Sequence, residues 1–319
     1  MAQTGNRTRP SQERGGQKPR SGGGNRSGGG RGSGGGRGPG RGRSGRGGAR
    51  RQAGFPWVRV AVPGLVVLVI VIVVVIVSVT GGGGGKPSSA IDYSPAAAGV
   101  VSDVSNVPLS TFDQVKVPSG AASAPKVISK ATPLILGGKP EILYMGDEWC
   151  PYCGAARWAM VVALSRFGTF TGLKTTMSSG SDVDPDTNTF SFVGSTYSSP
   201  YLSFVPVEMQ NASRVNLQTP TAAQAKILQT YDSQGSVPFI DFANKYIVNS
   251  TYDPAVLQGL SWSQIASQLA DPSSTVAKNI DGSANFMSAI ICKLTNGQPG
   301  GVCTSAGVQA ASSILASVK

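Results

Sequence analysis

The 319-residue sequence contains no histidine. Without an imidazole the chain cannot form the Ser–His and Cys–His pairs that activate nucleophiles, and it has no histidine general base or metal ligand. Cysteine is scarce as well, with only four residues: Cys150, Cys153, Cys292 and Cys303. These two absences exclude most enzyme classes, and the candidate chemistry that remains is that of the cysteine thiols.

Acidic residues are almost missing from the first 59 positions, where Glu13 stands against fourteen arginines and lysines. The formal net charge of +12 therefore belongs to this segment, and the rest of the chain is close to neutral. Repeats such as "SGGGNRSGGGRG" offer almost no apolar surface, so we predict a disordered Arg/Gly-rich cytoplasmic tail over residues 1–56. We expect the tail to touch anionic membrane lipid. Nucleic-acid binding through text such as Arg46-Gly47-Gly48 is the less favoured alternative.

One long run lacks charge altogether, from Val60 to Val79. About twenty apolar residues span a hydrocarbon core of roughly 30 Å. Arginines precede the run and a Gly/Ser-rich stretch follows it, so the positive-inside rule predicts a cytoplasmic N-terminus. The run is longer than the apolar core of a cleaved signal peptide. We therefore predict a single-pass transmembrane helix over residues 57–80, in the cell membrane, with everything beyond it extracytoplasmic.

The exported part begins with Gly, Pro, Ser and Ala-rich text, which predicts a flexible linker over residues 81–106. Residues 107–319 are enough for one domain. Periodicity and turn signals predict strands at 110–117, 141–146, 172–179 and 190–211, a helix from Cys153, a helix capped by Thr219, a hairpin around Ala243-Asn244, and helices at 261–271, 283–297 and 305–318. This order predicts an α/β fold with one central sheet and flanking helices.

Cys150 and Cys153 stand two residues apart where a predicted strand meets a predicted helix. At a helix N-terminus the backbone N–H groups and the helix dipole stabilise a thiolate, so Cys150 is the predicted nucleophile. Cys153, one helical turn further, is the predicted resolving thiol. A zinc site formed by all four cysteines and an inert local bridge are the alternatives. The spacing of the second pair, ten residues apart, disfavours zinc.

Cys292 and Cys303 flank the Gly/Pro loop "KLTNGQPGGV". Closing so short a loop with a disulfide stabilises a fold by on the order of 3 kcal/mol in the chain-entropy model. We predict a structural disulfide, and a second redox pair that passes electrons to the first is the alternative. Val237-Pro238 opens a predicted strand, where a cis bond would be a specific constraint.

Two motifs resemble the thioredoxin superfamily. "EWCPYC" resembles the thioredoxin active-site motif, with the central Pro-Tyr of glutaredoxins, and "GSVPFIDFANKY" resembles the cis-proline loop and hairpin. The resemblance implies a thioredoxin-like sheet with an insertion around residues 180–210. It also implies that Pro238 is a cis-proline packed against the cysteines, and that Val237 and Trp149 contribute to substrate binding.

The exported region as a whole, including "MGDEWCPYCGAARWAM" and "SFVPVEMQN", resembles an uncharacterised prokaryotic family, domain of unknown function 929. The sequence departs from thioredoxins in one place, because Tyr144 stands where they carry a buried acid. Glu141, Asp147 and Glu148 are the acids near the motif that remain as proton acceptors, and none of them occupies the position that the resemblance requires.

The sequence thus predicts a membrane-anchored, extracytoplasmic thiol–disulfide oxidoreductase that uses no cofactor and no metal. Its expected partners are thiols and disulfides of exported proteins and a membrane or extracytoplasmic redox partner. The compartment favours oxidation or isomerisation over reduction. The alternative, from a different class, is a thioredoxin-fold binding or chaperone module without essential redox activity.

Overall fold

The computed structural model describes residues 93–117 and 125–318, all of which belong to one unit of the chain. The tail predicted over 1–56, the transmembrane helix predicted over 57–80 and the first part of the linker lie outside these residues. Within the described ranges, no helix combines the length and the apolar character needed to cross a membrane.

The described chain alternates short strands with helices. In chain order its elements are α2 (Ala98–Ser105), α3 (Leu109–Val115), β1 (Lys126–Val127), β2 (Ile135–Leu136), β3 (Lys139–Gly146), α4 (Pro151–Ser165), β4 (Thr169–Thr171), β5 (Lys174–Met177), β6 (Asn188–Ser191), β7 (Thr196–Ser198), β8 (Ser203–Glu208), α5 (Ala222–Tyr231), β9 (Phe239–Phe242), β10 (Tyr246–Val248), the 3₁₀ helix η1 (Pro254–Leu257), α6 (Trp262–Gln268), α7 (Thr275–Leu294), α8 (Gly300–Cys303) and α9 (Ala306–Ser317).

The central sheet is mixed and is built around β3. Strand β3 pairs in parallel with β8 and antiparallel with β9, and the β9–β10 hairpin and then β1 continue the sheet beyond it. Strand β2 forms a short hairpin with the start of β3. Two separate ribbons, β4–β7 and β5–β6, stand apart from this sheet. The predicted α/β fold with one central sheet and flanking helices is confirmed at this level.

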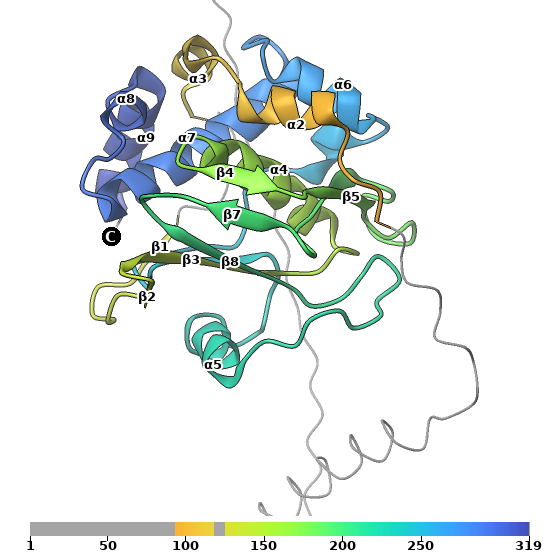
Figure 1. Ribbon diagram of the computed structural model, residues 1–319, viewed down its shortest axis with the longest axis horizontal. Helices are drawn as coiled ribbons and strands as arrows, with labels where there is room; N and C mark the ends of the chain where they lie inside the picture. Colours follow the sequence, from red (N-terminus) through yellow and green to blue (C-terminus); the bar gives the residue numbers. More distant parts are fainter. Residues whose placement is uncertain (1–92, 118–124, 319) are drawn as a thin grey trace, which may run out of the picture. The chain divides into compact units, whose positions relative to one another are not determined.

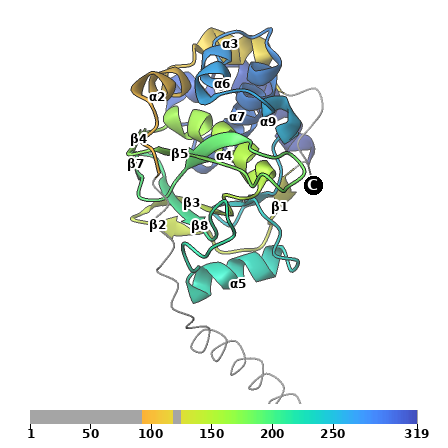
Figure 2. The same cartoon turned by 90° about the vertical axis from the view of Figure 1, so that its right-hand side faces the viewer.

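Helices cover the two faces of the sheet unequally. Helices α2, α3, α4, α6, α7 and α9 lie on one side of the sheet, and α5 lies on the other (Figures 1 and 2). Side chains of β3 alternate between the two layers, as a strand requires. Ile142 and Tyr144 belong to the large core under α4, whereas Leu143 and Met145 belong to the smaller core under α5.

Helix α4 begins at Cys150 as its N-cap residue and has Pro151 in its first turn, a position where proline costs no hydrogen bond. Its body is buried almost all round, and Trp158 packs on Phe190 with ring centroids 4.4 Å apart. A helix without a solvent-facing side belongs between other layers. Helix α4 therefore lies between the sheet and α7, and these neighbouring layers fix the position of the turn that leads into it.

The strand predicted at 110–117 is wrong, because these residues form most of helix α3. Phe112 is 2 % exposed, and the guanidinium of Arg166 stacks 4.0 Å from its ring centroid. The Asn285 amide donates to the carbonyls of Phe112 and Lys116 at 2.8 and 2.7 Å, which satisfies the C-terminal end of the helix. These partners lie more than 50 residues away, so the local alternation of residues could not reveal them.

The flexible linker predicted over 81–106 is wrong for its last part, which forms helix α2. Val100 and Val104 are buried against the main core, although their neighbours are mostly small or polar. The long strand predicted over 190–211 is three strands, β6, β7 and β8. Only β8 joins the central sheet, at an edge, where Pro206 is tolerated because one side of the strand needs no donor.

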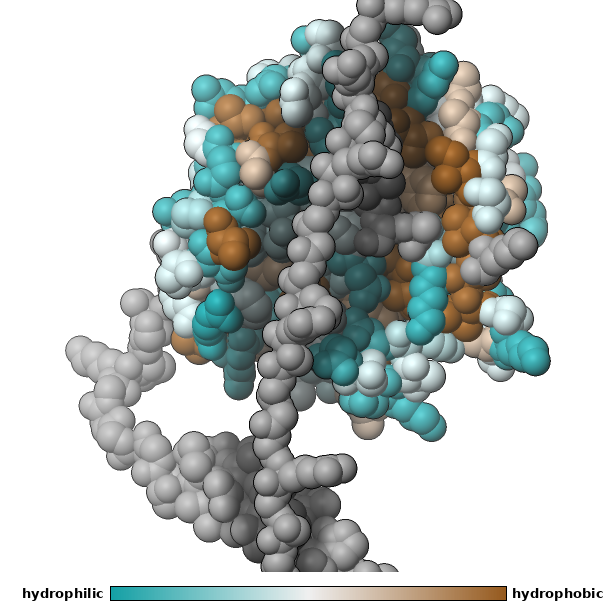
Figure 3. All heavy atoms as spheres, turned by 180° about the vertical axis from the view of Figure 1, so that it is seen from behind, coloured by the Kyte–Doolittle hydropathy of each residue, from teal (hydrophilic) through white to brown (hydrophobic). Residues whose placement is uncertain are grey.

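Elsewhere the predicted elements hold with shifted ends. Helix α5 is capped by Thr221, whose side chain and Gln224 form a reciprocal capping box, and not by Thr219. The turn of the β9–β10 hairpin is at Ala243 and Asn244, both with positive φ. Seen from behind, hydrophobic surface residues form several groups among hydrophilic ones (Figure 3). Apolar side chains make up a large share of the surface of most folded proteins.

Candidate functional site

The end of β3 delivers the chain into the N-terminus of α4, and Cys150 lies at that junction. Its sulfur accepts a hydrogen bond from the backbone N–H of Cys153 at 3.3 Å. Both cysteines are free thiols. Cys150 is 5 % exposed and Cys153 is fully buried. The structure therefore presents Cys150, and not Cys153, to a reacting partner.

The two thiols differ in acidity in the same sense. A hydrogen bond from the Cys153 thiol lowers the pKa of Cys150 most, and the backbone N–H groups of Cys153 and Tyr152 and the charge of Arg157 add to this effect against the cost of burial. Burial raises the pKa of Cys153 well above its ordinary value, and the neighbouring Cys150 raises it further. Of the two thiols, Cys150, the one that can reach a partner, therefore ionises more readily.

Val237 and Pro238 meet the cysteine pair from the start of β9. Their peptide bond is cis. The Cys150 thiol donates to the carbonyl of Val237, with 3.9 Å between sulfur and oxygen. Pro238 is buried and Val237 is half-buried. Val237 stands 87 positions after the cysteine that it contacts, and the β3–β9 pairing brings the two together.

Trp149 lies directly before Cys150 and is held from two sides. Its indole N–H donates to the Gln210 side-chain oxygen at 3.0 Å, and the Arg214 guanidinium stacks 3.7 Å from the ring centroid. Arg214 also pairs with Asp182 at 3.2 Å. Stacking of this kind fixes an aromatic side chain without burying it. Trp149 therefore stays half-buried at the edge of the site.

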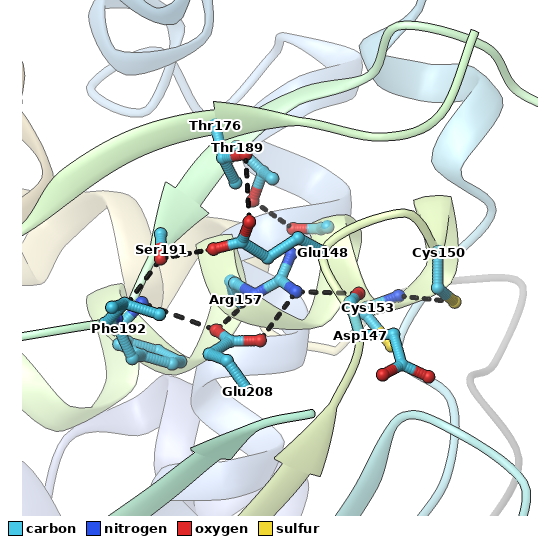
Figure 4. Close-up of polar contacts among 12 residues, drawn as sticks. Asp147, Glu148, Cys150, Cys153, Arg157, Thr176, Thr189, Ser191, Phe192 and Glu208 are labelled. Carbon is cyan, nitrogen blue, oxygen red and sulfur yellow. Dashed lines mark hydrogen bonds and ion pairs between the residues drawn. The ribbon is translucent and has the colours of Figure 1, made fainter. Parts of the chain in front are cut away.

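A buried ion pair lies beneath the cysteine loop (Figure 4). Arg157 on α4 donates through Nε and one terminal nitrogen to the two carboxylate oxygens of Glu208, at 2.8 and 2.9 Å. The same terminal nitrogen donates to the carbonyl of Asp147 at 2.8 Å. Both charged side chains are fully buried. The bidentate pair thus links β8, α4 and the turn before Cys150, and it places a fixed positive charge near both thiols.

Glu208 was not identified from the sequence as a site residue, although a signal was present. Arg157 is the lone charge inside the apolar run of α4, and Glu208 is the lone charge at the end of "SFVPVE". Two isolated and opposite charges in apolar text predict a buried pair, because neither is tolerated inside a protein alone. Strand pairing then places Glu208 opposite Gly146, next to the turn that leads to Cys150.

The acids near the motif have different surroundings. Glu141 stands near the start of β3, five residues before its end, and is half-buried. Glu148 is fully buried and accepts hydrogen bonds from Ser191, Tyr93 and Thr176. Asp147 is 6 % exposed. Tyr144 is fully buried, and burial raises the pKa of its hydroxyl well above the ordinary value.

Cys292 and Cys303 form a disulfide that joins the end of α7 to α8, with 5.6 Å between their Cα atoms. Their sulfurs are therefore not available to complete a four-cysteine zinc site with Cys150 and Cys153. In the part of the chain that the structure describes, no three Cys, Asp or Glu side chains come together in a way that could hold a metal ion.

A family model matches residues 126–293, which is more than half of the chain and includes both the cysteine motif and the cis-proline. Comparison with curated proteins and with solved structures gave no significant match. The chain therefore belongs to the family described as Domain of unknown function (DUF929).

Proposed function

We propose that this protein is a thiol–disulfide oxidoreductase in which Cys150 is the nucleophile and Cys153 the resolving thiol. The observation that carries the proposal is the position of Cys150. It caps α4, has a lowered pKa, and lies 3.9 Å from the carbonyl of Val237 beside the cis-proline. A stabilised thiolate beside the backbone of Val237, which precedes β9, is suited to attack a disulfide in a peptide segment that binds there.

The arrangement of elements supports the resemblance to thioredoxins. Strand β3, the cysteine helix α4, strand β8, helix α5, cis-Pro238 and the β9–β10 hairpin follow one another in the order that the resemblance implies. The ribbons β4–β7 and β5–β6 lie between α4 and β8 and account for the expected insertion. We therefore propose a thioredoxin-like fold for the described domain.

The proposed reaction proceeds in two exchanges. The Cys150 thiolate attacks one sulfur of a partner disulfide, a bond forms between these sulfurs, and the other partner sulfur leaves as a thiolate. The Cys153 thiolate then attacks Cys150 and releases the partner's remaining sulfur. Two electrons pass from the cysteine pair to the partner, which is reduced while the pair becomes a disulfide. In reverse, the same steps oxidise a partner dithiol.

The acidity of Cys150 supports a direction. Stabilising its thiolate stabilises the reduced form of the pair, and a stable reduced form makes the disulfide a stronger oxidant. We propose oxidation or isomerisation of exported proteins, with Val237, Pro238 and Trp149 contacting the substrate. The apolar run Val60–Val79 and the arginines before it support a single membrane anchor, a basic tail that touches lipid, and a redox partner in or beyond the membrane.

Substituting Cys153→Ser in the full-length protein tests the proposal, because the first exchange can then occur and the second cannot. The variant is expected to accumulate mixed disulfides with exported proteins, visible on non-reducing gels and lost on reduction. Cys150→Ser is the matched control and should trap none. A Cys153→Ser variant that traps no partner would contradict the proposal and would favour a binding or chaperone module instead.

A further inference from the structure

This inference rests on the proposed function, whose second exchange requires a proton acceptor for the Cys153 thiol. Cys153 must lose its proton before it attacks, yet it is fully buried and its pKa is raised by burial and by Cys150. Proton acceptors of suitable pKa near such a group accelerate the step, commonly by about 10²–10⁴-fold.

Three buried groups near the pair are unsuited to this role. The Tyr144 hydroxyl stays protonated near neutral pH because burial raises its pKa, so it is not a proton acceptor. Both carboxylate oxygens of Glu208 are bonded to Arg157. Both oxygens of Glu148 accept hydrogen bonds from hydroxyl groups, and its carboxylate points toward Ser191 and Thr176 in Figure 4. These groups are occupied by structural contacts.

Asp147 is arranged differently. Its backbone forms a hydrogen bond to Cys153 that lowers the pKa of that thiol. In Figure 4 its carboxylate lies on the side of Cys153 and is directed away from the hydroxyl cluster around Glu148. Among the described residues, its buried Oδ1 has no hydrogen-bond partner. A buried carboxylate oxygen without a partner is costly in a folded protein, and such groups call for a functional explanation.

Asp147 borders a surface cavity. The cavity has a volume of about 340 Å³, and Asp147 forms part of its wall. Gln210, Asn216, Gln218 and Thr219 contribute polar groups to the wall, and Met209 and Pro220 complete it. A cavity of this size with polar groups in its wall admits several water molecules. A proton on Asp147 can therefore exchange with bulk water without passing through Cys150 or the substrate.

We propose that Asp147 accepts the proton of the Cys153 thiol, returns it in the reverse reaction, and exchanges it with solvent through the cavity that it lines. The proton moves from the Cys153 sulfur to an Asp147 carboxylate oxygen. The resulting thiolate forms the bond to Cys150 as the bond between Cys150 and the partner sulfur breaks. The partner leaves as a thiolate, so charge and protons balance, and no further reactant is needed.

The surroundings of Asp147 suit this exchange. Burial raises its pKa to about 6, while a backbone hydrogen bond from Gln210 and the charges of Arg157 and Arg214 act in the opposite direction. Glu208, on the adjacent strand, adds to the raising effect. At neutral pH the carboxylate is therefore ionised and can accept a proton, and it takes up protons more readily than an exposed aspartate does.

The experiment follows the two exchanges separately in full-length protein. Protein with reduced Cys150 and Cys153 is mixed with glutathione disulfide, the reaction is quenched with acid, and mass spectrometry measures the Cys150–glutathione mixed disulfide and its conversion to the Cys150–Cys153 disulfide. The rate of this conversion is recorded between pH 5 and 9. The wild-type rate is expected to rise through an inflection near pH 6 as Asp147 ionises.

Asp147→Asn is expected to accumulate the mixed disulfide, to slow its conversion by about 10- to 100-fold at pH 7 and to lose the inflection near pH 6. Asp147→Glu should keep an inflection at a shifted pH, and it replaces the Asn variant if that variant fails to fold. Glu148→Gln, a buried acid at the next position, is the matched control and should keep the wild-type inflection.

The outcomes separate the two proposals. An Asp147→Asn variant that converts the mixed disulfide with the wild-type rate and the wild-type inflection would overturn the role of Asp147 and leave the proposed function standing. An Asp147→Glu variant without any change in the inflection would do the same. Wild-type protein that forms neither the mixed disulfide nor the Cys150–Cys153 disulfide would instead overturn the proposed function itself.

Discussion

The two cysteine pairs of this protein occupy opposite ends of helices. Cys150 caps the N-terminus of α4, and both thiols of its pair are free. Cys292 lies near the C-terminus of α7 and Cys303 ends α8, and these two form a disulfide. The N-terminus of a helix carries partial positive charge and the C-terminus partial negative charge. The helix terminus therefore stabilises a thiolate at Cys150 and disfavours one at Cys292.

The number of residues between two cysteines therefore does not by itself assign a role to the pair. Because reduction of a disulfide releases thiolates, we expect the pair at a helix N-terminus to exchange more readily than the pair at helix C-termini. The buried cation Arg157 strengthens the contrast, because it lowers the pKa of both Cys150 and Cys153.

The largest expected effect is the loss of disulfide exchange when Cys150 is replaced by serine. Exchange with glutathione disulfide should fall to the uncatalysed background, because the nucleophile is gone. Replacing both Cys292 and Cys303 by alanine should leave the exchange rate within about twofold, once the folded fraction is taken into account. If the double variant lost exchange as completely as Cys150→Ser does, Cys292 and Cys303 would take part in the redox reaction.

Removing the cation beneath the first pair should cost about 3–5 kcal/mol of unfolding free energy, because Arg157→Met leaves Glu208 buried without a partner. The same variant should raise the pKa of Cys150, measured from the pH dependence of alkylation. Arg157→Met combined with Glu208→Leu should recover much of the stability but not the pKa. A single variant as stable as the wild type in urea unfolding would contradict this account.

Breaking the second pair should affect stability and not chemistry. Cys292→Ala with Cys303→Ala is expected to lower the unfolding free energy by about 3 kcal/mol, since the bridge closes a short loop. Denaturant unfolding measures the loss. Differential alkylation of the wild type should also find the Cys150–Cys153 bridge reduced at lower reductant concentration than the Cys292–Cys303 bridge. If both bridges were reduced at the same reductant concentration, the structural role of the Cys292–Cys303 bridge would be contradicted.

The smallest expected effect concerns Asp281, on the helix that carries Cys292. Burial raises its pKa to about 8, partly offset by Arg166. The folded protein therefore binds a proton that the unfolded chain releases above about pH 4, and stability falls as the pH rises from about 4 to 8. Asp281→Asn should stabilise the protein by about 1–2 kcal/mol at pH 7 and by less at pH 5. A gain independent of pH in thermal or urea unfolding would contradict this sign.

Local signals predicted much of the fold. The buried strand that became β3, the helix after Cys150, the β9–β10 hairpin and the capped helix α6 all carry their information in a few adjacent residues. Helix α3 was missed because distant partners stabilise it, namely Arg166 on the ring of Phe112 and Asn285 at its last carbonyls. Tertiary contacts overrode the strand-like alternation of these residues.

The candidate site, like the fold, was predictable from the sequence only in part. The sequence identifies Cys150, Cys153, Val237 and Pro238 because motif and turn residues stand together in the text. It also contains the isolated charges Arg157 and Glu208, yet their pairing depends on the parallel register of β3 and β8. The distinction between Asp147 and its neighbour Glu148 required the directions of two adjacent side chains, which composition and spacing do not encode.

The hydrogen bond between Tyr93 and Glu148 has a mechanical meaning. The Tyr93 hydroxyl donates to the Glu148 carboxylate at 2.9 Å, and Glu148 stands two residues before Cys150. The backbone beside Tyr93 is also held, because Thr175 donates to the carbonyl of Ser94 at 3.0 Å. A force applied to the chain before Tyr93 is therefore transmitted first to β5 and to the turn that leads to the cysteines.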